Sequence, residues 1–150
     1  MRESMFSILG NLTGMSFLDC FAGSGIVGVE AAGRGASPVV FVEKDRKKIP
    51  VLKKNIAFVE EQTSVRGMDV MRYLKSCTEN YNLIYLDPPF AMAEKEKLIR
   101  LVEEQKILST GGRLLLHHPK GEDYPEKIGT FFLERTKSYG GSILRFYRNS

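Results

Sequence analysis

The chain has 150 residues, of which 43% are hydrophobic and 27% charged, and these values predict one globular domain that buries about two thirds of its unfolded surface. No apolar run approaches the roughly 18 residues of a membrane span, and the start at Met1 lacks the features of a secretory signal, so we expect a cytoplasmic protein. The two cysteines have no metal-type spacing, and the net charge of +4 permits a nucleic-acid partner without requiring one.

The first half of the chain alternates strands and helices. Short apolar runs rich in β-branched residues predict buried strands, and apolar residues three or four positions apart predict helices behind them. Pro50 lacks the N–H that would bond to the carbonyl of Arg46, so we expect the helix after the second strand to start late or to bend. The expected elements are a helix over 3–9, strands over 16–20, 38–45 and 63–69, and a helix after each of these strands.

The second half repeats this pattern and then changes. The segment YNLIYLDPPF over 81–90 predicts a strand that stops at its two prolines, so a loop begins at Asp87. A helix over 93–106 and a strand over 113–118 follow, and two extended runs within 129–147 flank Gly140-Gly141 as in an antiparallel hairpin. This order predicts an α/β fold with a mostly parallel sheet, an antiparallel C-terminal edge and helices on both faces.

Four acidic residues fall at the carboxyl ends of four successive predicted strands: Asp19, Glu43, Asp69 and Asp87. Ligands of such sheets bind at that edge, so we expect the four side chains to converge on one crevice. Acidic residues also end strands and form turns without binding a ligand, and this is the alternative for each of them taken singly.

Three glycines have the G-x-G-x-x-G spacing of a tight strand-to-helix turn that a ligand can approach: Gly23, Gly25 and Gly28. Asp19, just before this turn, would repel the pyrophosphate of NAD, whereas S-adenosylmethionine carries a cationic sulfonium and an ammonium group. We therefore expect S-adenosylmethionine, with Asp19 near the cation. Glu43, 20 residues after Gly23, would accept the ribose hydroxyls, and Asp69 would accept the adenine amino group.

The loop DPPF over 87–90 suits methylation of an exocyclic amine on a base. Such a nitrogen is a poor nucleophile because its lone pair is delocalised into the ring, so both of its N–H bonds need acceptors. The Asp87 carboxylate and the Pro88 carbonyl are two acceptors, and a hydrogen bond to a charged acceptor contributes about 1.5–3 kcal/mol. Phe90 can stack on the base, and the prolines would hold these groups in register. The alternative is a strand ended by a proline turn, with Phe90 in the core.

Basic residues gather in two places. One stretch, Lys44, Arg46, Lys47, Lys48, Lys53 and Lys54, is explained equally well by a solvated helix face and by contact with RNA phosphates. The terminal hairpin adds Arg135, Lys137, Arg145 and Arg148 as candidate phosphate contacts. His117 and His118 are neighbours on a predicted strand and point to opposite faces, so no metal site is predicted.

The segments FLDCFAGSGIVGVEAAGRGA, VVFVEKD, LIYLDPPF and SYGGSILRFYR resemble the class I methyltransferases that modify the 2-amino group of a guanine in bacterial small-subunit (16S) ribosomal RNA, the RsmD family. The resemblance covers nearly the whole chain. It implies a Rossmann-like sheet of seven strands in the order 3-2-1-4-5-7-6, S-adenosylmethionine as methyl donor, and ribosomal RNA or the small ribosomal subunit as partner. The implied catalytic residues are Asp87, Pro88, Pro89 and Phe90, and the expected cofactor-binding residues are Asp19, Phe21, Ala22, Gly23, Gly25, Glu43, Lys44, Asp69, Val70 and Asp87.

Family members usually carry a basic, extended segment before the stretch matched by RESMFSIL, which here starts directly after Met1. We therefore expect residues 1–150 to be a single catalytic domain without that extension, acting as a monomer. Three alternatives remain open at this point: methylation of adenine N6 in DNA, methylation of a protein glutamine, and a domain that binds cofactor or RNA without turnover.

Overall fold

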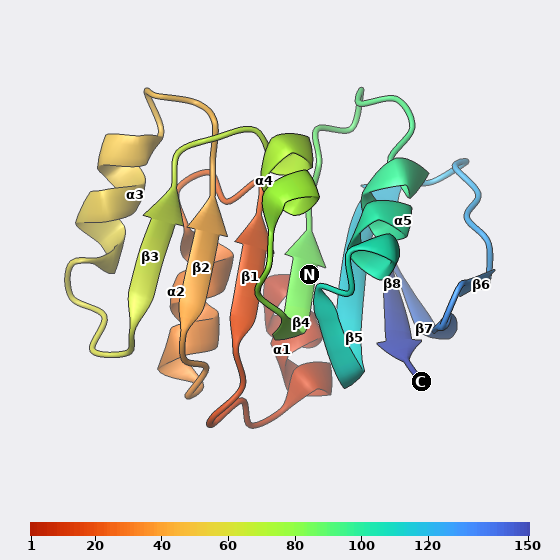
Figure 1. The fold of residues 1–150 in the computed structure, drawn as a ribbon, viewed down its shortest axis with the longest axis horizontal. Coiled ribbons are helices and arrows are strands. Elements are labelled where there is room, and N and C mark those ends of the chain that lie inside the picture. Colours follow the sequence, from red (N-terminus) through yellow and green to blue (C-terminus); the bar gives the residue numbers. More distant parts are fainter. The chain divides into compact units, whose positions relative to one another are not determined.

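The computed structural model describes residues 1–150 as two compact units, Met1–Val70 and Met71–Ser150, which are considered one at a time (Figure 1). Both units combine strands with helices. The chain has eight strands in place of the seven expected, and the expected α/β class is confirmed.

The first unit contains three parallel strands in the order β3-β2-β1. Every residue of β1 and β2 is buried, as expected for parallel strands covered on both faces. Figure 1 draws α2 behind β1 and β2. The elements are α1 (Arg2–Leu9), β1 (Phe17–Cys20), α2 (Ile26–Gly33), β2 (Val39–Val42), α3 (Ile49–Ile56) and β3 (Thr63–Arg66).

Helix α3 corrects one expectation. It begins at Ile49, and Pro50 occupies its first turn. The first four N–H groups of a helix have no partner within the helix, so a proline there loses no hydrogen bond and its fixed φ suits the start. The helix therefore neither starts after Pro50 nor needs a bend.

The second unit begins within α4 (Val70–Ser76) and contains five strands in the order β4-β5-β8-β7-β6. Strands β4 and β5 are parallel, and the remaining neighbours are antiparallel. The extra strand is the two-residue β6 at the edge; without it, the order in each unit is the expected one. The remaining elements are β4 (Tyr81–Leu86), α5 (Glu96–Glu104), β5 (Leu108–Pro119), β6 (Lys127–Ile128), β7 (Phe131–Tyr139) and β8 (Ser142–Asn149).

Strand β5 is longer than expected because it contains a bulge. Leu108 pairs with Tyr81 and Arg113 with Leu83, so residues 109–112 lie outside the regular ladder. Gly112 is tightly enclosed there, since an added Cβ would lie 2.9 Å from the carbonyl oxygen of Asn82. The glycine pair interrupts the register of the strand without ending it.

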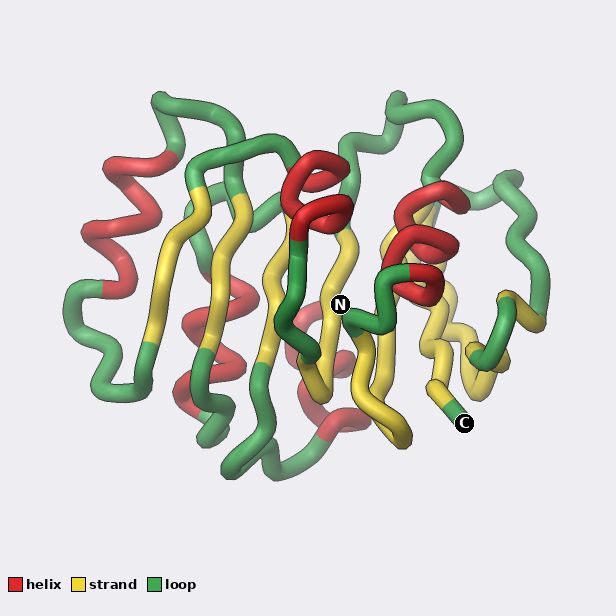
Figure 2. The backbone as a smooth tube through the Cα atoms, in the orientation of Figure 1, coloured by secondary structure: helices red, strands yellow, loops and turns green.

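The C-terminal hairpin is confirmed, with β7 and β8 joined at Gly140-Gly141. Helix α5 is shorter than the range expected for it, because residues 87–95 form the loop that follows β4 (Figure 2). This loop and the hairpin both contribute to the site described next.

Candidate active site

The glycine loop over residues 21–25 joins β1 to α2. Its backbone is held by two hydrogen bonds, from Ala22 N–H to the Val42 carbonyl at 3.0 Å and from Gly25 N–H to the Ala22 carbonyl at 2.9 Å. Gly23 has a φ of 58°, and a Cβ added there would have no atom within 4 Å. The loop is therefore open at Gly23, where a ligand can approach the backbone.

Two other glycines of the motif are required by packing within the unit. A Cβ on Gly25 would collide with the side chain of Leu52 in α3, and a Cβ on Gly28 would collide with the ring of Phe41 in β2. The motif thus divides into one position that is open and two that allow close packing of helices on the strands.

Phe21 holds an unusual backbone conformation for a residue with a side chain. Its φ is 63°, in the left-handed region, which costs of order 1–3 kcal/mol and is concentrated at functional sites. This strained residue is the first of the loop and directly follows Cys20, the last residue of β1. The observation supports the expectation that residues 21–25 form a ligand site.

Glu43 fixes the glycine loop from the end of β2. Its side chain is buried, its Oε1 accepts a hydrogen bond from Gly23 N–H at 2.7 Å, and its Oε2 accepts one from Asp45 N–H at 2.9 Å. A carboxylate oxygen has two acceptor positions, so Glu43 can hold the loop and still accept a hydroxyl group. Its role toward ribose stays a prediction.

Asp19 has a structural partner that the sequence analysis does not anticipate. It is 1% exposed, and its Oδ2 accepts a hydrogen bond from Gly28 N–H at 3.0 Å, in the first turn of α2. A carboxylate at a helix N-terminus satisfies a free N–H and interacts favourably with the helix dipole. Asp19 thus anchors α2 to β1, and its proximity to a cofactor cation stays a prediction.

The other expected cofactor residues of the first unit differ in exposure. Lys44 and Asp69 are exposed, whereas Val70 is buried at 3% exposure. Their contacts with a cofactor stay predictions, as does the convergence of the four acidic residues on one crevice.

In the second unit, β4 ends at Leu86 and the loop begins at Asp87, as predicted. The Asp87 side chain is 37% exposed, and both of its oxygens have partners. Oδ1 lies 2.9 Å from Nδ1 of His117, and Oδ2 accepts a hydrogen bond from the Tyr85 hydroxyl at 3.3 Å. Asp87 is therefore fixed in position while remaining accessible.

The rest of the DPPF loop presents an aromatic ring. Pro88 is buried and Pro89 is exposed, while Phe90 is 48% exposed. The alternative that Phe90 is a core residue is wrong. An exposed ring beside a fixed carboxylate is a surface on which a flat, hydrogen-bonding group can stack.

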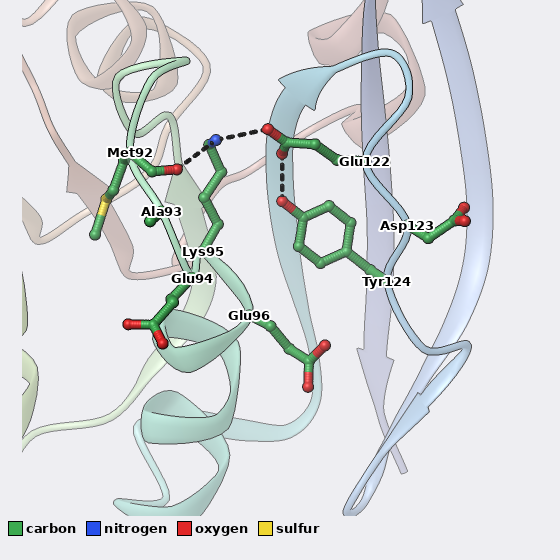
Figure 3. Close-up of a pocket in the computed structure, with 8 residues that line it drawn as sticks. All are labelled: Met92, Ala93, Glu94, Lys95, Glu96, Glu122, Asp123 and Tyr124. Carbon is green, nitrogen blue, oxygen red and sulfur yellow. Dashed lines mark hydrogen bonds and ion pairs between the residues drawn. The ribbon is translucent and has the colours of Figure 1, made fainter.

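A buried lysine holds this loop from inside the unit (Figure 3). The Lys95 side chain is 1% exposed, and its Nζ donates hydrogen bonds to the carbonyls of Phe90 and Met92 and to Oε2 of Glu122, each at 2.9 Å. Glu122 also accepts a hydrogen bond from the Tyr124 hydroxyl at 2.6 Å, and burial together with this carboxylate raises the pKa of Tyr124. The sequence pattern gives no sign of this role for Lys95, because a lysine among glutamates at a helix start is typical of exposed surface.

His117 and His118 point to opposite faces of β5, as predicted, and have different partners. His118 is fully buried, donates from Nδ1 to the Pro119 carbonyl at 2.8 Å, and accepts at Nε2 from Arg145 at 2.9 Å. Burial lowers the pKa of His118, which favours the neutral ring that accepts this bond. His117 contacts Asp87 instead. No group of three His, Cys, Asp or Glu residues is placed to hold a metal ion.

Some of the basic residues considered as RNA contacts are exposed, and others are bonded within the protein. All six in the stretch over 44–54 are exposed. On the hairpin, Arg145 bonds to His118 and lies over the ring of Tyr124, and Arg148 bonds to Glu134. Arg145 and Arg148 are thus committed to contacts within the unit, which leaves Arg135 and Lys137 as hairpin candidates for phosphate.

Comparison with known proteins identifies the family. The family described as "Conserved hypothetical protein 95" matches residues 1–148. The putative rRNA methyltransferase YlbH of Bacillus subtilis is 31% identical, over 98% of this chain and 83% of its own length. Ribosomal RNA small subunit methyltransferase D of Escherichia coli is 30% identical, over 98% of this chain and 75% of its own length. The chain belongs to the RsmD family. Its fold matches the putative methyltransferase YhhF of Escherichia coli with a TM-score of 0.91 and 29% identity, over 99% of this chain and 83% of that one.

Membership of this family confirms the expected S-adenosylmethionine-dependent methyltransferase. The fold is also that of SMU.776, a putative methyltransferase solved with S-adenosylhomocysteine, at a TM-score of 0.77 and 18% identity over 95% of this chain and 47% of that one. The open backbone at Gly23 and the spare acceptor positions of Glu43 fit such a cofactor. None of the helices has the length and apolar character needed to cross a membrane.

Proposed function

We propose that this RsmD-family protein methylates the exocyclic amino group, N2, of a guanine in small-subunit (16S) ribosomal RNA, in the cytoplasm. The observation that carries the proposal is the fixed, accessible carboxylate of Asp87 next to the exposed ring of Phe90. The names of the relatives, which describe ribosomal RNA methyltransferases, support the substrate class.

Asp87 and Phe90 have complementary tasks in this proposal. A base taken out of its stack lies on the Phe90 ring, with stacking worth about 1–3 kcal/mol. Asp87 and the Pro88 carbonyl accept hydrogen bonds from the two N–H groups of the amine. The lone pair of the amine nitrogen is then directed away from these two acceptors. Asp87 also stabilises the positive charge that develops on nitrogen and takes the proton that the methylated amine releases.

The glycine loop and Glu43 hold the methyl donor in this proposal. When bound, S-adenosylmethionine supplies a methyl group on a cationic sulfonium. Gly23 offers backbone without a side chain to the methionine end, and Glu43 accepts the ribose hydroxyls through the acceptor positions that Gly23 and Asp45 leave free. Asp69 receives the adenine amino group.

The exposed basic stretch before α3 and along that helix is the proposed contact for RNA phosphates. Six exposed cations lie within residues 44–54, where Asp45 is the one acidic residue. Contacts of this kind position RNA without reading its sequence, so the DPPF loop rather than this stretch selects the base.

The test is transfer of labelled methyl groups from S-adenosylmethionine to four substrates, which are naked 16S ribosomal RNA, assembled small subunits, DNA and protein. The labelled nucleoside or amino acid is then identified. We expect 2-methylguanosine in RNA. Label in N6-methyladenine of DNA or in a protein glutamine would replace the proposal with one of its alternatives.

Two variants test the division of labour between the two residues. Asp87→Ala is expected to abolish transfer while calorimetry shows cofactor affinity near that of the wild type. Glu43→Ala is expected to weaken cofactor binding, because it removes the ribose acceptor and frees the glycine loop. A loss of cofactor affinity in Asp87→Ala, with none in Glu43→Ala, would reverse the assigned roles.

A further inference from the structure

An unbroken line of hydrogen bonds connects Asp87 to the C-terminal hairpin. Oδ1 of Asp87 lies 2.9 Å from Nδ1 of His117, and Nε2 of the same ring lies 2.8 Å from Oγ of Ser142. The Ser142 hydroxyl in turn donates to the Tyr139 carbonyl at 3.2 Å. The line thus joins the loop after β4, the strand β5 and the two strands of the hairpin, all within the second unit.

The partners of His117 determine where its protons lie. An ionised carboxylate only accepts hydrogen bonds, so Nδ1 donates to Asp87. The Ser142 hydroxyl has one proton and two acceptors within reach, Nε2 of His117 at 2.8 Å and the Tyr139 carbonyl at 3.2 Å, so it holds the far side of the ring in place. In a serine hydrolase the serine donates to the histidine, which then removes its proton. Ser142, by contrast, is only 9% exposed and also contacts the Tyr139 carbonyl, so it acts here as an anchor for the ring.

The same imidazole also contacts the aromatic residue of the DPPF loop. The ring centres of Phe90 and His117 are 5.4 Å apart, and the planes meet at 62°, an edge-to-face arrangement. Such a contact restricts how the Phe90 ring can turn. His117 itself is 13% exposed, compared with 37% for Asp87. The imidazole therefore lies behind the two residues that are offered to the substrate.

We propose that His117 is a positioning residue for methyl transfer, which orients the Asp87 carboxylate and the Phe90 ring together. This inference rests on the proposed function. The hydrogen bonds from His117 and Tyr85 use two of the four acceptor positions of the Asp87 carboxylate, and the others remain for the substrate amine. Without His117, the carboxylate can rotate about its side-chain bonds and the Phe90 ring loses a neighbour.

A matched pair of substitutions separates this role from a general need for a side chain at position 117. The amide nitrogen in His117→Asn lies near the place of Nδ1 and can still donate to Asp87, whereas that in His117→Gln lies near the place of Nε2 and can only reach Ser142. We expect His117→Gln to lower kcat about 100-fold, the typical cost of a misplaced catalytic group, and His117→Asn to retain most of the turnover. KM for RNA and cofactor affinity should change little in both variants. Equal turnover of the two variants would overturn the inference.

Nuclear magnetic resonance tests the hydrogen-bond line without any enzyme assay. The chain has 2 histidines, so labelling their ring nitrogens gives two sets of signals, which His118→Gln assigns. We expect Nδ1 of His117 to be protonated in the wild type and to lose its bonded-proton signal in Asp87→Ala, with His118 unchanged. An unprotonated Nδ1 in the wild type would overturn the inference.

The wild-type assay distinguishes failure of this inference from failure of the proposed function. If the wild type methylates no guanine, the proposed function fails and the positioning role fails with it. If the wild type is active and His117→Gln has its full turnover, only the role of His117 fails.

Discussion

Replacing Lys95 with methionine is expected to destabilise the protein strongly. Lys95→Met keeps most of the side-chain volume but removes the buried ammonium and its three hydrogen bonds. The carbonyls of Phe90 and Met92 lose a donor, whereas Glu122 is 33% exposed and keeps its bond from Tyr124, so water can replace the lysine there. Removing one partner of a buried ion pair costs about 3–5 kcal/mol, and the exposure of Glu122 favours the lower end, about 3 kcal/mol.

The assay is denaturant unfolding with Lys97→Met as the matched control. Lys97 lies two positions away, and its pair with Glu94 is exposed on both sides, at 61% and 65%. Exposed pairs contribute about 0–1 kcal/mol, so the control should unfold near the wild-type midpoint. Equal unfolding free energies for the two variants would refute the argument that the burial of Lys95, and not its charge alone, stabilises the DPPF loop. Methyl transfer by Lys95→Met should fall as well, because the loop that carries Asp87 loses its support.

Two further predictions concern packing and protonation. Gly28→Ala should lower the unfolding free energy by about 1–3 kcal/mol, because the added Cβ collides with Phe41. The control, Gly33→Ala in the same helix, has open space around its Cβ and should be neutral or slightly stabilising. Similar losses of unfolding free energy in both variants would contradict the packing argument. Burial lowers the pKa of His118, so the unfolded chain binds a proton more readily than the native one, and stability is lost as pH falls below the ordinary histidine value of about 6.5. His118→Gln should therefore lose less stability than the wild type between about pH 7 and pH 5, and parallel curves from denaturant titrations would contradict this reasoning.

The sequence predicts the fold well where a local signal and the overall pattern agree. The buried strands β1, β2 and β4, the loop that begins at Asp87 and the hairpin at Gly140-Gly141 are found as expected, whereas β3 is half-buried and ends at Arg66, before the expected residue 69. The predicted element boundaries are wrong where the effect of a proline or glycine depends on its position within the helix or strand. Pro50 is compatible with a helix because it stands in the first turn, and β5 begins at Leu108, before the expected residue 113, because a bulge accommodates Gly111-Gly112. A pattern of residue types does not reveal either position in advance.

The site is predicted less completely, because its supporting contacts join residues far apart in sequence. Asp87 and Phe90 are identified by their motif, but His117 lies 30 positions from Asp87 and Glu122 lies 27 positions from Lys95. Adjacent histidines carry no signal that one of them contacts a carboxylate. Contacts of this kind appear only when the strand order is known.

The position of β8 has a consequence for how the protein is made. This strand is the last of the sheet in chain order, yet it lies between β5 and β7 and pairs with both. Until β8 has been synthesised, β5 has an unpaired edge on that side and Ser142 is not in place beside His117. The second unit therefore cannot complete its sheet until β8 has been synthesised. A protein built in this way fixes the surroundings of Asp87 only when the final strand of the unit has joined the sheet.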